Sequence, residues 1–232
     1  MAEYEVKTAM IVGASRTLGL GLADAYLRAG WNVIATARTS PAPGLEELAT
    51  SAPGRLRVEE LDMTDPDGVR ALRGRLAGEQ LDLLFVNAAI TNGDEPVNVV
   101  SEETFTTVMV TNAYAPLQII ESFGDLVGPT GVLGIMSSSQ GSISLNTNGG
   151  HEVYRASKAA LNQLMRSYAA RHAHDPRALV LVNPGWVKTE LGGAGAQLTV
   201  DESIPGVVAA IEAQRGTPGL HFVDHRGQVV PW

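Results

Sequence analysis

Two residues in the second half of the chain, Tyr154 and Lys158, are of types and spacing that could carry acid–base chemistry. They lie in a segment rich in helix formers with no Gly or Pro before Asp175, which predicts a helix. Residues i and i+4 share one helix face, so the two side chains are expected to point the same way. An ammonium group beside a phenol favours the phenolate, which is expected to lower the tyrosine pKa from about 10 toward the working range of a catalyst. Because this spacing is common, the pair alone is also compatible with an ordinary helix surface.

A cluster of serines precedes this pair. The apolar stretch 131–136 predicts a buried strand that runs into Ser137, Ser138 and Ser139. The carboxyl ends of strands are where open α/β sheets bind ligands. The sequence therefore places a hydroxyl where it could meet a bound molecule.

The rest of the chain alternates between strand and helix patterns that would position these residues. Apolar or alternating runs predict strands at 8–12, 31–36, 56–61, 81–86, 131–136, 179–182 and 220–223. Helices are expected from the glycine-rich segment to Gly30, at 45–50, from Asp65 to Leu76, from Ser101 to Phe123, around Tyr154, and after Asp201–Ser203. This alternation indicates βαβ units with right-handed crossovers. The expected fold is α/β, a single Rossmann-type doubly wound parallel sheet with helices on both faces, and residues 1–232 are expected to form one domain.

Composition narrows the classes of function. The chain has 25 acidic and 17 basic residues, a net charge of −8 and no Lys/Arg run, which argues against a nucleic-acid partner. It has no cysteine, which excludes disulfides and a thiolate nucleophile, and its scattered histidines suggest no metal site. The first residues lack the pattern of a signal peptide, and no apolar run reaches the roughly 18 residues of a membrane span. A cytoplasmic protein without a membrane partner is expected.

A glycine-rich segment, Gly13 to Gly19, joins the first strand to the first helix. Such a turn lets the pyrophosphate of a dinucleotide approach backbone N–H groups at the positive end of a helix. After the second strand the chain has Arg38 where an NAD site usually has an acid, and Arg16 adds a second positive charge. Guanidinium groups suit a 2′-phosphate, so NADP(H) is favoured over NAD(H). Alternatively, both arginines are solvated surface residues.

Together these residues resemble the short-chain dehydrogenase/reductase family over nearly the whole chain. The resemblance includes Gly13–Gly19, Asp62, Asn87–Ala89, Asn112, Ser138, Tyr154 with Lys158, and Pro184–Gly185 with Thr189. The long interval between Ser138 and Tyr154, together with the ending 222–232, is similar to the C-factor-like and carbonyl-reductase branch. The family implies a reversible oxidoreductase that acts on small carbonyl compounds or alcohols.

The resemblance also implies roles for individual residues. Tyr154 would exchange the proton with the substrate oxygen, Ser138 would hydrogen-bond that oxygen, and Lys158 would lower the tyrosine pKa and hold the nicotinamide ribose. Asn112 would support a water that links Lys158 to solvent. Asp62 and Met63 would contact the adenine, and Asn87–Ala89 the adenosine side. Val187 and Thr189 would hold the carboxamide. The full set expected to contact the cofactor is Gly13, Ser15, Arg16, Thr17, Leu18, Gly19, Arg38, Asp62, Met63, Asn87, Ala88, Ala89, Tyr154, Lys158, Pro184, Gly185, Val187 and Thr189.

Three positions depart from the family pattern. Thr17 stands where the middle glycine of the turn is usual, and a β-branched residue does not readily adopt positive φ. Either the turn differs, or the threonine hydroxyl bonds a phosphate. Ala89 replaces a glycine, and Val86 replaces a preceding asparagine. These changes put the cofactor affinity and the turn geometry in question.

The expected activity is NADPH-dependent reduction of a ketone or aldehyde to an alcohol. The segment 190–201, which forms the substrate lid in this family, is rich in Gly and Ala, and predicts a mobile cover with broad acceptance. Two alternatives stay open: a cofactor-binding signalling or regulatory protein of the C-factor type, and a sugar-nucleotide epimerase or dehydratase. An epimerase or dehydratase would need a substantial C-terminal substrate domain. By family habit, a homodimer or homotetramer is expected. His151 could line the substrate mouth or be a loop residue, and Trp186 could form a substrate wall or pack in the core.

Overall fold

The computed structural model describes residues 6–232. The strands are β1 (Thr8–Val12), β2 (Asn32–Ala37), β3 (Leu56–Glu60), β4 (Leu81–Val86), β5 (Val127–Met136), β6 (Ala178–Asn183) and β7 (Gly219–Asp224). The α-helices are α1 (Thr17–Arg28), α2 (Pro43–Ser51), α3 (Pro66–Arg75), α4 (Glu102–Met109), α5 (Ala115–Phe123), α6 (Glu152–Arg171) and α7 (Val200–Gln214). Shorter turns are the π-helical η1 (Val110–Tyr114) and the 3₁₀ segments η2 (Gly124–Leu126) and η3 (Ser139–Gly141).

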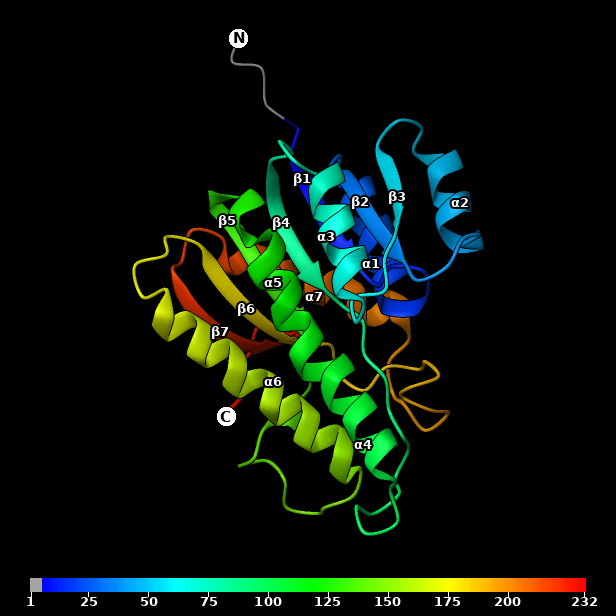
Figure 1. Cartoon of the computed structure of the whole chain (residues 1–232), viewed down its shortest axis with the longest axis vertical. Helices are drawn as coiled ribbons and strands as arrows, with labels where there is room; N and C mark the ends of the chain where they lie inside the picture. Colours follow the sequence, from blue (N-terminus) through cyan, green and yellow to red (C-terminus); the bar gives the residue numbers. More distant parts are fainter. Residues whose placement is uncertain (1–5) are drawn as a thin grey trace.

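Within the described residues, seven strands form one sheet in the order β3-β2-β1-β4-β5-β6-β7, and each neighbouring pair is parallel (Figure 1). The order reverses between β1 and β4, which pair directly. The predicted α/β fold with a doubly wound parallel sheet is therefore confirmed. In such sheets the crevice beyond the carboxyl ends of the strands at the reversal point is the usual ligand site.

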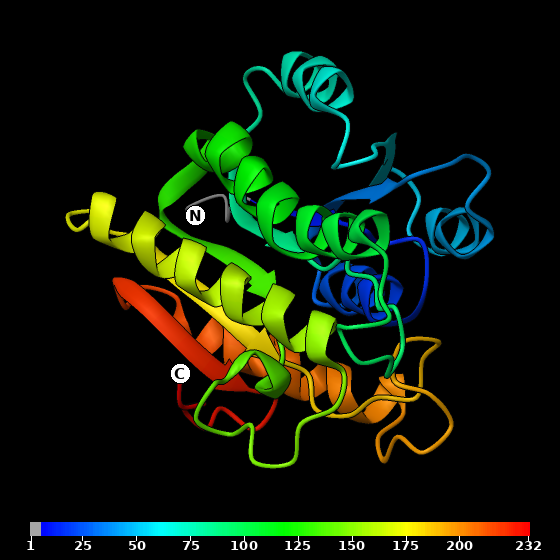
Figure 2. The ribbon, with the colours of Figure 1, turned by 60° about the horizontal axis from the view of Figure 1, so that its bottom comes forward.

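Alternate residues of each strand point to opposite faces, and each face has its own core. Met10 and Val12 pack with apolar residues of α3, α5 and α6. Ala9 and Ile11 pack with apolar residues of α1, α2 and α7. Figure 2 shows the resulting layers, with helices on both sides of the sheet. Burial on both faces explains why the central strands are continuous apolar runs.

The long helix expected from Ser101 to Phe123 is interrupted. Ser101 caps α4 as expected, accepting a hydrogen bond from the backbone N–H of Thr104. The turn Val110–Tyr114 is π-helical and separates α4 from α5. Pro116 has no N–H to donate to the carbonyl of Asn112, so the ordinary α-helical bonding cannot continue there. The interruption contains Asn112, one of the residues expected in the catalytic site.

Three other boundaries differ from expectation. β5 begins at Val127, before Gly131, and α2 begins at Pro43, a residue whose fixed φ suits the first turn of a helix. α7 begins at Val200, ahead of Asp201. Thr199 is its N-cap and forms a reciprocal capping box with Glu202, which the sequence analysis overlooked.

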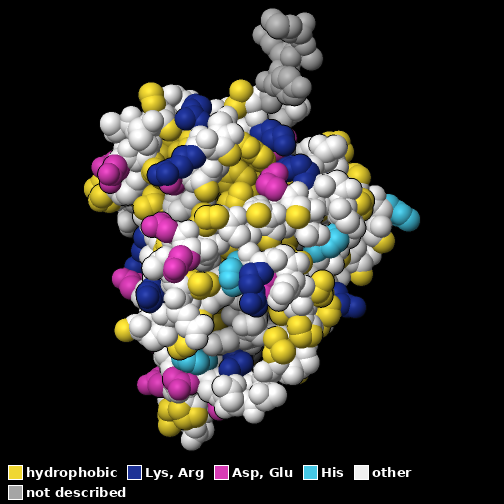
Figure 3. Space-filling view, turned by 180° about the vertical axis from the view of Figure 1, so that it is seen from behind, with side chains coloured by type: hydrophobic (Ala, Val, Ile, Leu, Met, Phe, Trp, Pro, Cys, Tyr) yellow, Lys and Arg dark blue, Asp and Glu magenta, His cyan; other side chains and the backbone are white. Residues whose placement is uncertain are grey.

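The face formed by α1 and α7 carries positive and negative side chains interspersed with apolar ones (Figure 3). Among residues 6–232, no helix is both long enough and apolar enough to cross a membrane.

Candidate functional site

The candidate residues gather at the carboxyl ends of four neighbouring strands. The glycine-rich turn follows β1, Asn87 follows β4, Ser137–Ser139 follow β5, and Pro184–Gly185 follow β6. Because the strands are parallel, these four segments meet at one edge of the sheet. The sheet thus brings together residues as far apart in the sequence as Gly13 and Gly185, and this edge includes the reversal point between β1 and β4.

The glycine-rich turn is closely packed against the segment after β4. A Cβ built on Gly13 would lie 2.6 Å from the Cβ of Ala88, and Gly13 has φ +81°. A Cβ on Gly19 would overlap the carbonyl oxygen of Gly13 and lie 2.7 Å from Asn87 Nδ2. Asn87 Nδ2 donates to the Gly13 carbonyl at 2.9 Å. Two glycines at these positions are therefore required by close approach, which leaves backbone N–H groups accessible at the start of α1.

Thr17 adopts the conformation that the sequence analysis considered unfavourable. Its φ is +48°, so the turn keeps a left-handed residue here despite the branched side chain. Such a conformation costs a non-glycine residue on the order of 1–3 kcal/mol. The first of the two options, a different turn without positive φ at Thr17, is therefore wrong. A bond between its hydroxyl and a phosphate stays a prediction.

Ala89 needs no left-handed conformation. Among residues 6–232, the non-glycine residues with positive φ are Thr17 and His151. Replacement of the usual glycine by Ala89 therefore adds no backbone strain, and this part of the turn geometry is no longer in question.

The two arginines expected at the phosphate end lie at the surface. Arg38 follows β2 and is exposed, and its charge helps to lower the pKa of Asp62, although hydrogen bonds from Thr64 lower it more. Arg16 is exposed and pairs with Glu190, at the start of the segment predicted to be the lid. An ion pair this exposed stabilises the fold little, so Arg16 is free to exchange its partner.

Asp62 and Met63 differ in accessibility. Asp62 is exposed, and its Oδ1 accepts from the backbone N–H and the hydroxyl of Thr64 at 2.8 and 2.7 Å. The Met63 side chain is buried in the core beneath α3. An adenine contact by Met63 can therefore involve little of its side chain.

Tyr154 and Lys158 lie one turn apart in the first half of α6 and are both buried, with exposed fractions of 8% and 1%. The lysine Nζ lies 5.9 Å from the centre of the tyrosine ring. It donates to the carbonyl oxygen of Met136, the last residue of β5, at 2.9 Å. This bond fixes α6 against the carboxyl end of β5, where the serine cluster begins.

Of the three serines, Ser138 is the one that meets the tyrosine. Its hydroxyl lies close enough to the Tyr154 phenol to lower the pKa of that group, and its Oγ accepts from the backbone N–H of Gln140 at 3.1 Å. Ser137 is buried, and its hydroxyl donates to Asn162 Oδ1 at 2.7 Å. The Ser137 hydroxyl is therefore committed to the packing of α6 on β5, whereas Ser138 faces the phenol.

The pKa of Tyr154 moves in the direction opposite to the one expected from the sequence. Burial raises it to about 12, and the nearby Ser138 hydroxyl offsets this rise only in part. Burial lowers the pKa of Lys158 to about 7. Loss of solvent disfavours both charged forms, and the lysine ammonium bonds a carbonyl oxygen rather than the phenol. The expectation that the lysine alone brings the tyrosine pKa down was wrong because sequence spacing does not reveal burial.

Asn112 is fully buried in the π-helical turn, and its amide is committed to protein groups. Oδ1 accepts from the N–H of Ile90 at 2.8 Å, and Nδ2 donates to the Ile90 carbonyl at 2.8 Å and to Ser157 Oγ at 3.0 Å. The side chain thereby ties the segment after β4 to α6, close to Tyr154. Both Nδ2 hydrogens are used, so a water held by Asn112 would bond the second lone pair of Oδ1 or the main chain.

The segment after β6 has a tight turn and a tied loop. Gly185 has φ +83°, and a Cβ there would lie 2.7 Å from a methyl group of Leu198. Val187 is buried and bridges to Leu198, and Thr189 Oγ1 accepts from the N–H of Gly192 at 3.0 Å. Pro184, which is also buried, accepts a hydrogen bond from Ser203 through its carbonyl. The base of the predicted lid is thus built as a closed loop.

Trp186 and His151 have structural contacts of their own. Trp186 is 55% exposed, which excludes core packing, and its indole N–H donates to the carbonyl of Gly192 at 2.7 Å. His151 precedes α6 with φ +48°, and its N–H donates to Asp94 Oδ1 at 2.6 Å. His151 is therefore a loop-anchoring residue, and Trp186 supports the loop 190–198.

Sequence reasoning missed Asn162, which stands one turn beyond Lys158. Its Oδ1 accepts from Ser137, and its Nδ2 donates to the carbonyl of Gly141 at 3.1 Å. The second i, i+4 step after Tyr154 and Lys158 was the available signal. His225 was also missed because it is distant in sequence: pairing of β7 with β6 brings it against Gly185. Within the described part of the chain, no group of three or more His, Cys, Asp or Glu residues is placed to hold a metal ion.

The sequence matches the short chain dehydrogenase family over residues 7–197. It is 30% identical to the C-signal protein of Myxococcus xanthus over 166 residues, which are 71% of this chain and all of that protein. The structure is similar to that of a short-chain dehydrogenase/reductase from Burkholderia multivorans with bound NADP, with a TM-score of 0.96 and 49% identity over 98% of this chain and all of that one.

A carbonyl reductase from Pseudomonas aeruginosa PAO1 in complex with NADP is also similar, with a TM-score of 0.91 and 40% identity over the same shares of the two chains. The family match extends over most of the chain and includes the glycine-rich turn, Ser138, Tyr154 and Lys158. The chain belongs to the short-chain dehydrogenase family, and its structural neighbours include carbonyl reductases.

Proposed function

We propose that this protein is an oxidoreductase that reduces a ketone or aldehyde to an alcohol with NADPH. The observation that carries the proposal is the buried Tyr154 side chain, with the Ser138 hydroxyl close enough to lower its pKa and with Lys158 one helical turn away. This arrangement offers a proton donor and a second hydroxyl to the same substrate oxygen. The NADP-bound neighbours in the family support the choice of cofactor.

The residues at the sheet edge fit a phosphorylated dinucleotide. Gly13 and Gly19 allow the turn to pack tightly against Asn87 and Ala88, and the start of α1 that follows the turn would offer backbone N–H groups to a pyrophosphate. Arg16 and Arg38 are exposed guanidinium groups at the phosphate end, and Arg16 would exchange Glu190 for a 2′-phosphate. Ser15, Thr17 and Leu18 would contribute the rest of the turn, while Asp62, Asn87–Ala89, Val187 and Thr189 would complete the site.

Bound NADPH supplies the hydride in this chemistry. The chain supplies the proton: with a pKa of about 12, the Tyr154 phenol is protonated at neutral pH and can donate to a carbonyl oxygen. Ser138 would hold that oxygen. Lys158 Nζ lies 5.9 Å from the centre of the tyrosine ring, and in its protonated form it would favour the phenolate that remains after donation. The same atoms would run the reverse oxidation, and the protonated state of the tyrosine favours reduction.

The enzyme is expected to act as a homodimer or homotetramer, with residues 1–232 as one domain. Large apolar residues on the outer faces of α4, η1 and α6 support this assembly, because Phe105, Tyr114 and Leu164 are exposed on neighbouring elements. Sedimentation velocity would measure the assembly directly, and a monomer at micromolar concentration would contradict it.

The test of the proposed function is consumption of NADPH, compared with NADH, over a panel of ketones, diketones, quinones and aldehydes. The Tyr154→Phe variant provides the blank because it removes one oxygen and preserves the ring. Turnover that needs NADPH and disappears in the variant supports the reductase. NADPH binding without turnover on any member of the panel would contradict it.

That second outcome would favour a cofactor-binding signalling protein, the alternative suggested by similarity to C-signal over the whole of that protein. In that case Tyr154→Phe would preserve the biological activity. An epimerase or dehydratase is disfavoured, because the seven-stranded sheet and its helices occupy residues 8–224, which leaves no room for a separate substrate domain within the described residues.

A further inference from the structure

Two partly buried amide side chains near the catalytic tyrosine contain buried polar atoms without hydrogen-bond partners. Within residues 6–232, five buried side-chain polar atoms lack a partner, and three of them belong to Asn92 and Gln140. They are Nδ2 and Oδ1 of Asn92 and Oε1 of Gln140. Buried polar atoms are nearly always paired, and leaving one unpaired costs about 1–3 kcal/mol. A ligand that enters the site could pair these three atoms and remove that cost.

Asn92 lies beside the turn of α6 that carries Tyr154. On one side, Ile90 is held by Asn112, which also bonds Ser157 in α6. On the other side, the carbonyl of Gly93 contacts His151 Nδ1 at 3.1 Å, just before α6 begins. Tyr154 is midway between Ser157 and His151 along the helix. The segment that contains Asn92 therefore runs along α6 past the tyrosine.

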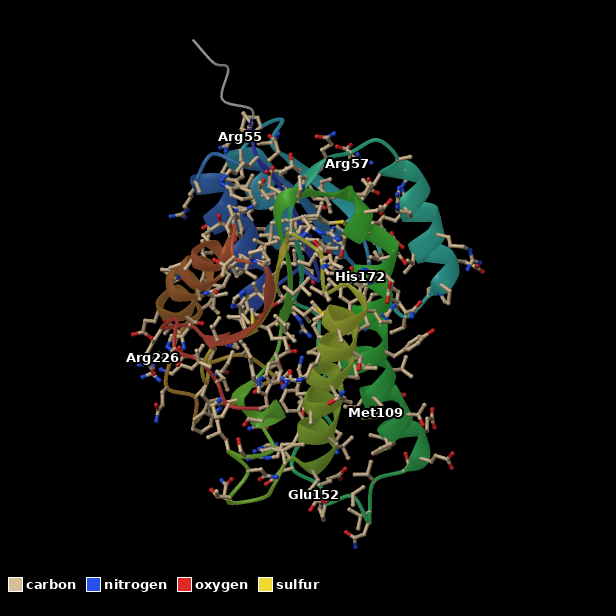
Figure 4. The ribbon with its side chains drawn as sticks, turned by 90° about the vertical axis from the view of Figure 1, so that its left-hand side faces the viewer. Arg55, Arg57, Met109, Glu152, His172 and Arg226 are labelled. Carbon is tan, nitrogen blue, oxygen red and sulfur yellow. The ribbon has the colours of Figure 1, made fainter. Side chains whose placement is uncertain are left out.

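The same segment continues to the first residue of α6. The backbone N–H of Val97 donates to Glu152 Oε2 at 2.8 Å. Figure 4 shows Glu152 at one end of α6 and His172 at the other. The segment after β4 is thus fixed at three points to the end of α6 that bears Tyr154, and Asn92 cannot move far from it.

Gln140 lies in η3, the turn that follows β5, and β5 is the neighbour of β4 in the sheet. Its backbone N–H donates to Ser138 Oγ. A Cβ on the next residue, Gly141, would lie 2.9 Å from the backbone of Lys158, so η3 rests directly on α6. Gln140 is therefore held between the serine and the lysine of the catalytic group.

We propose that Asn92 and Gln140 bind a hydroxyl group of the substrate, next to the carbonyl that is reduced. Two of the unpaired atoms are acceptors, and one is a donor. A hydroxyl accepts and donates, so it can pair Asn92 Nδ2 and one of the two acceptor oxygens, whereas a second carbonyl would leave both acceptors unpaired. The substrate class is therefore hydroxyketones and hydroxyaldehydes. This inference rests on the proposed reduction, and it adds the recognition of the substrate.

A site with buried polar atoms also rejects a substrate that lacks the matching group, because the atoms stay unpaired in that complex. One or two hydrogen bonds at about 0.5–1.5 kcal/mol each correspond to roughly a 2- to 150-fold preference for the hydroxylated compound. A pair of probes that differ only at this group measures the preference. We choose 2-hydroxyacetophenone, which has a CH₂OH beside the carbonyl, and propiophenone, which has CH₂CH₃ there.

The experiment measures the Kd of each probe with the NADP⁺ complex, and kcat/KM with NADPH, in the full-length protein. The variants are Asn92→Leu and Gln140→Met, which remove the amides at similar size, and Gln140→Glu, which keeps an acceptor. The matched controls are Asn98→Leu, exposed in the same segment, and Gln163→Met, exposed on α6. Circular dichroism and Tm identify any variant that fails to fold.

We expect the wild type and both controls to bind the hydroxyketone at least about 2-fold more tightly than propiophenone, and the ratio of the two Kd values to fall toward 1 in Asn92→Leu and Gln140→Met. Gln140→Glu should retain part of the preference. Equal Kd values for the two probes in the wild type, or a preference that survives both substitutions, would overturn the inference. Turnover without a preference for the hydroxyketone would support the proposed reductase and contradict the hydroxyl-binding subsite. A preference in Kd without turnover would support the subsite and contradict the reductase.

Discussion

The glycine-rich turn and the first half of α6 face the same sheet edge, and the sequence specifies them in opposite ways. The turn is shaped by side chains that are missing: Gly13 and Gly19 leave no space for a Cβ. The α6 segment is shaped by polar side chains that are present and buried, among them Tyr154 and Lys158. Substitutions in the turn should therefore act through steric overlap and cofactor binding. Substitutions in α6 should act through charge and turnover.

Gly19→Ala gives the largest expected change in stability, because its Cβ would overlap the carbonyl oxygen of Gly13 and approach the backbone of Ala14. We expect the free energy of unfolding to fall by about 3 kcal/mol and the NADPH affinity to fall more than tenfold. Urea denaturation and calorimetric titration measure the two effects.

Gly74→Ala in α3 is the matched control, since nothing lies within 4 Å of its added Cβ. Alanine in a helix interior should stabilise the protein by about 0.5–1 kcal/mol. A similar loss of stability in both variants would contradict the steric account of the turn.

Lys158→Met tests the electrostatic side of the comparison. Burial lowers the pKa of Lys158 to about 7 from 10.5, so below 10.5 the unfolded chain takes up a proton that the folded chain resists. Stability due to Lys158 is therefore complete above pH 10.5 and decreases as the pH falls toward 7. Between pH 9.5 and 7.5 the wild type should lose about 1 kcal/mol per pH unit relative to the variant.

Urea denaturation of both proteins at pH 7.5, 8.5 and 9.5 measures this difference. Ionisation of Tyr154 contributes little to the pH dependence of stability between pH 7.5 and 9.5. Its pKa of about 12 in the folded protein and its ordinary value near 10 both lie above this pH range. A difference in stability that stays constant over the three pH values would mean that Lys158 keeps its ordinary pKa.

Thr17→Gly has the smallest expected effect. The left-handed φ of +48° at Thr17 is strained for a branched residue and comfortable for glycine. The gain is reduced by the greater freedom of glycine in the unfolded chain, so we expect stabilisation by about 1 kcal/mol or less, measured by Tm. Thr107→Gly, exposed in α4, should destabilise instead. Loss of stability in Thr17→Gly would imply that the side chain of Thr17 is important to the turn.

The sequence predicted the alternation of strands and helices and the parallel sheet, because apolar runs and glycine positions are local signals, whereas the roles of Ser138 and Tyr154 came from the resemblance to the family. It could not predict the π-helical turn, which depends on how Pro116 removes a backbone donor opposite Asn112. It gave the wrong direction for the tyrosine pKa, because burial of Tyr154 is set by the packing of α6 on the sheet. The sequence also could not predict the places of Asn92, Gln140 and His225 in the site, because the pairing of neighbouring strands brings them there.

The most direct test of the central claim is to measure NADPH affinity and carbonyl turnover side by side in the wild type and Tyr154→Phe. If Tyr154 donates the proton, kcat/KM should fall by about 10²–10⁴-fold, while the Kd of NADPH stays within a few-fold. Turnover that survives in Tyr154→Phe would contradict the assignment of the proton donor and, with it, the account of this site.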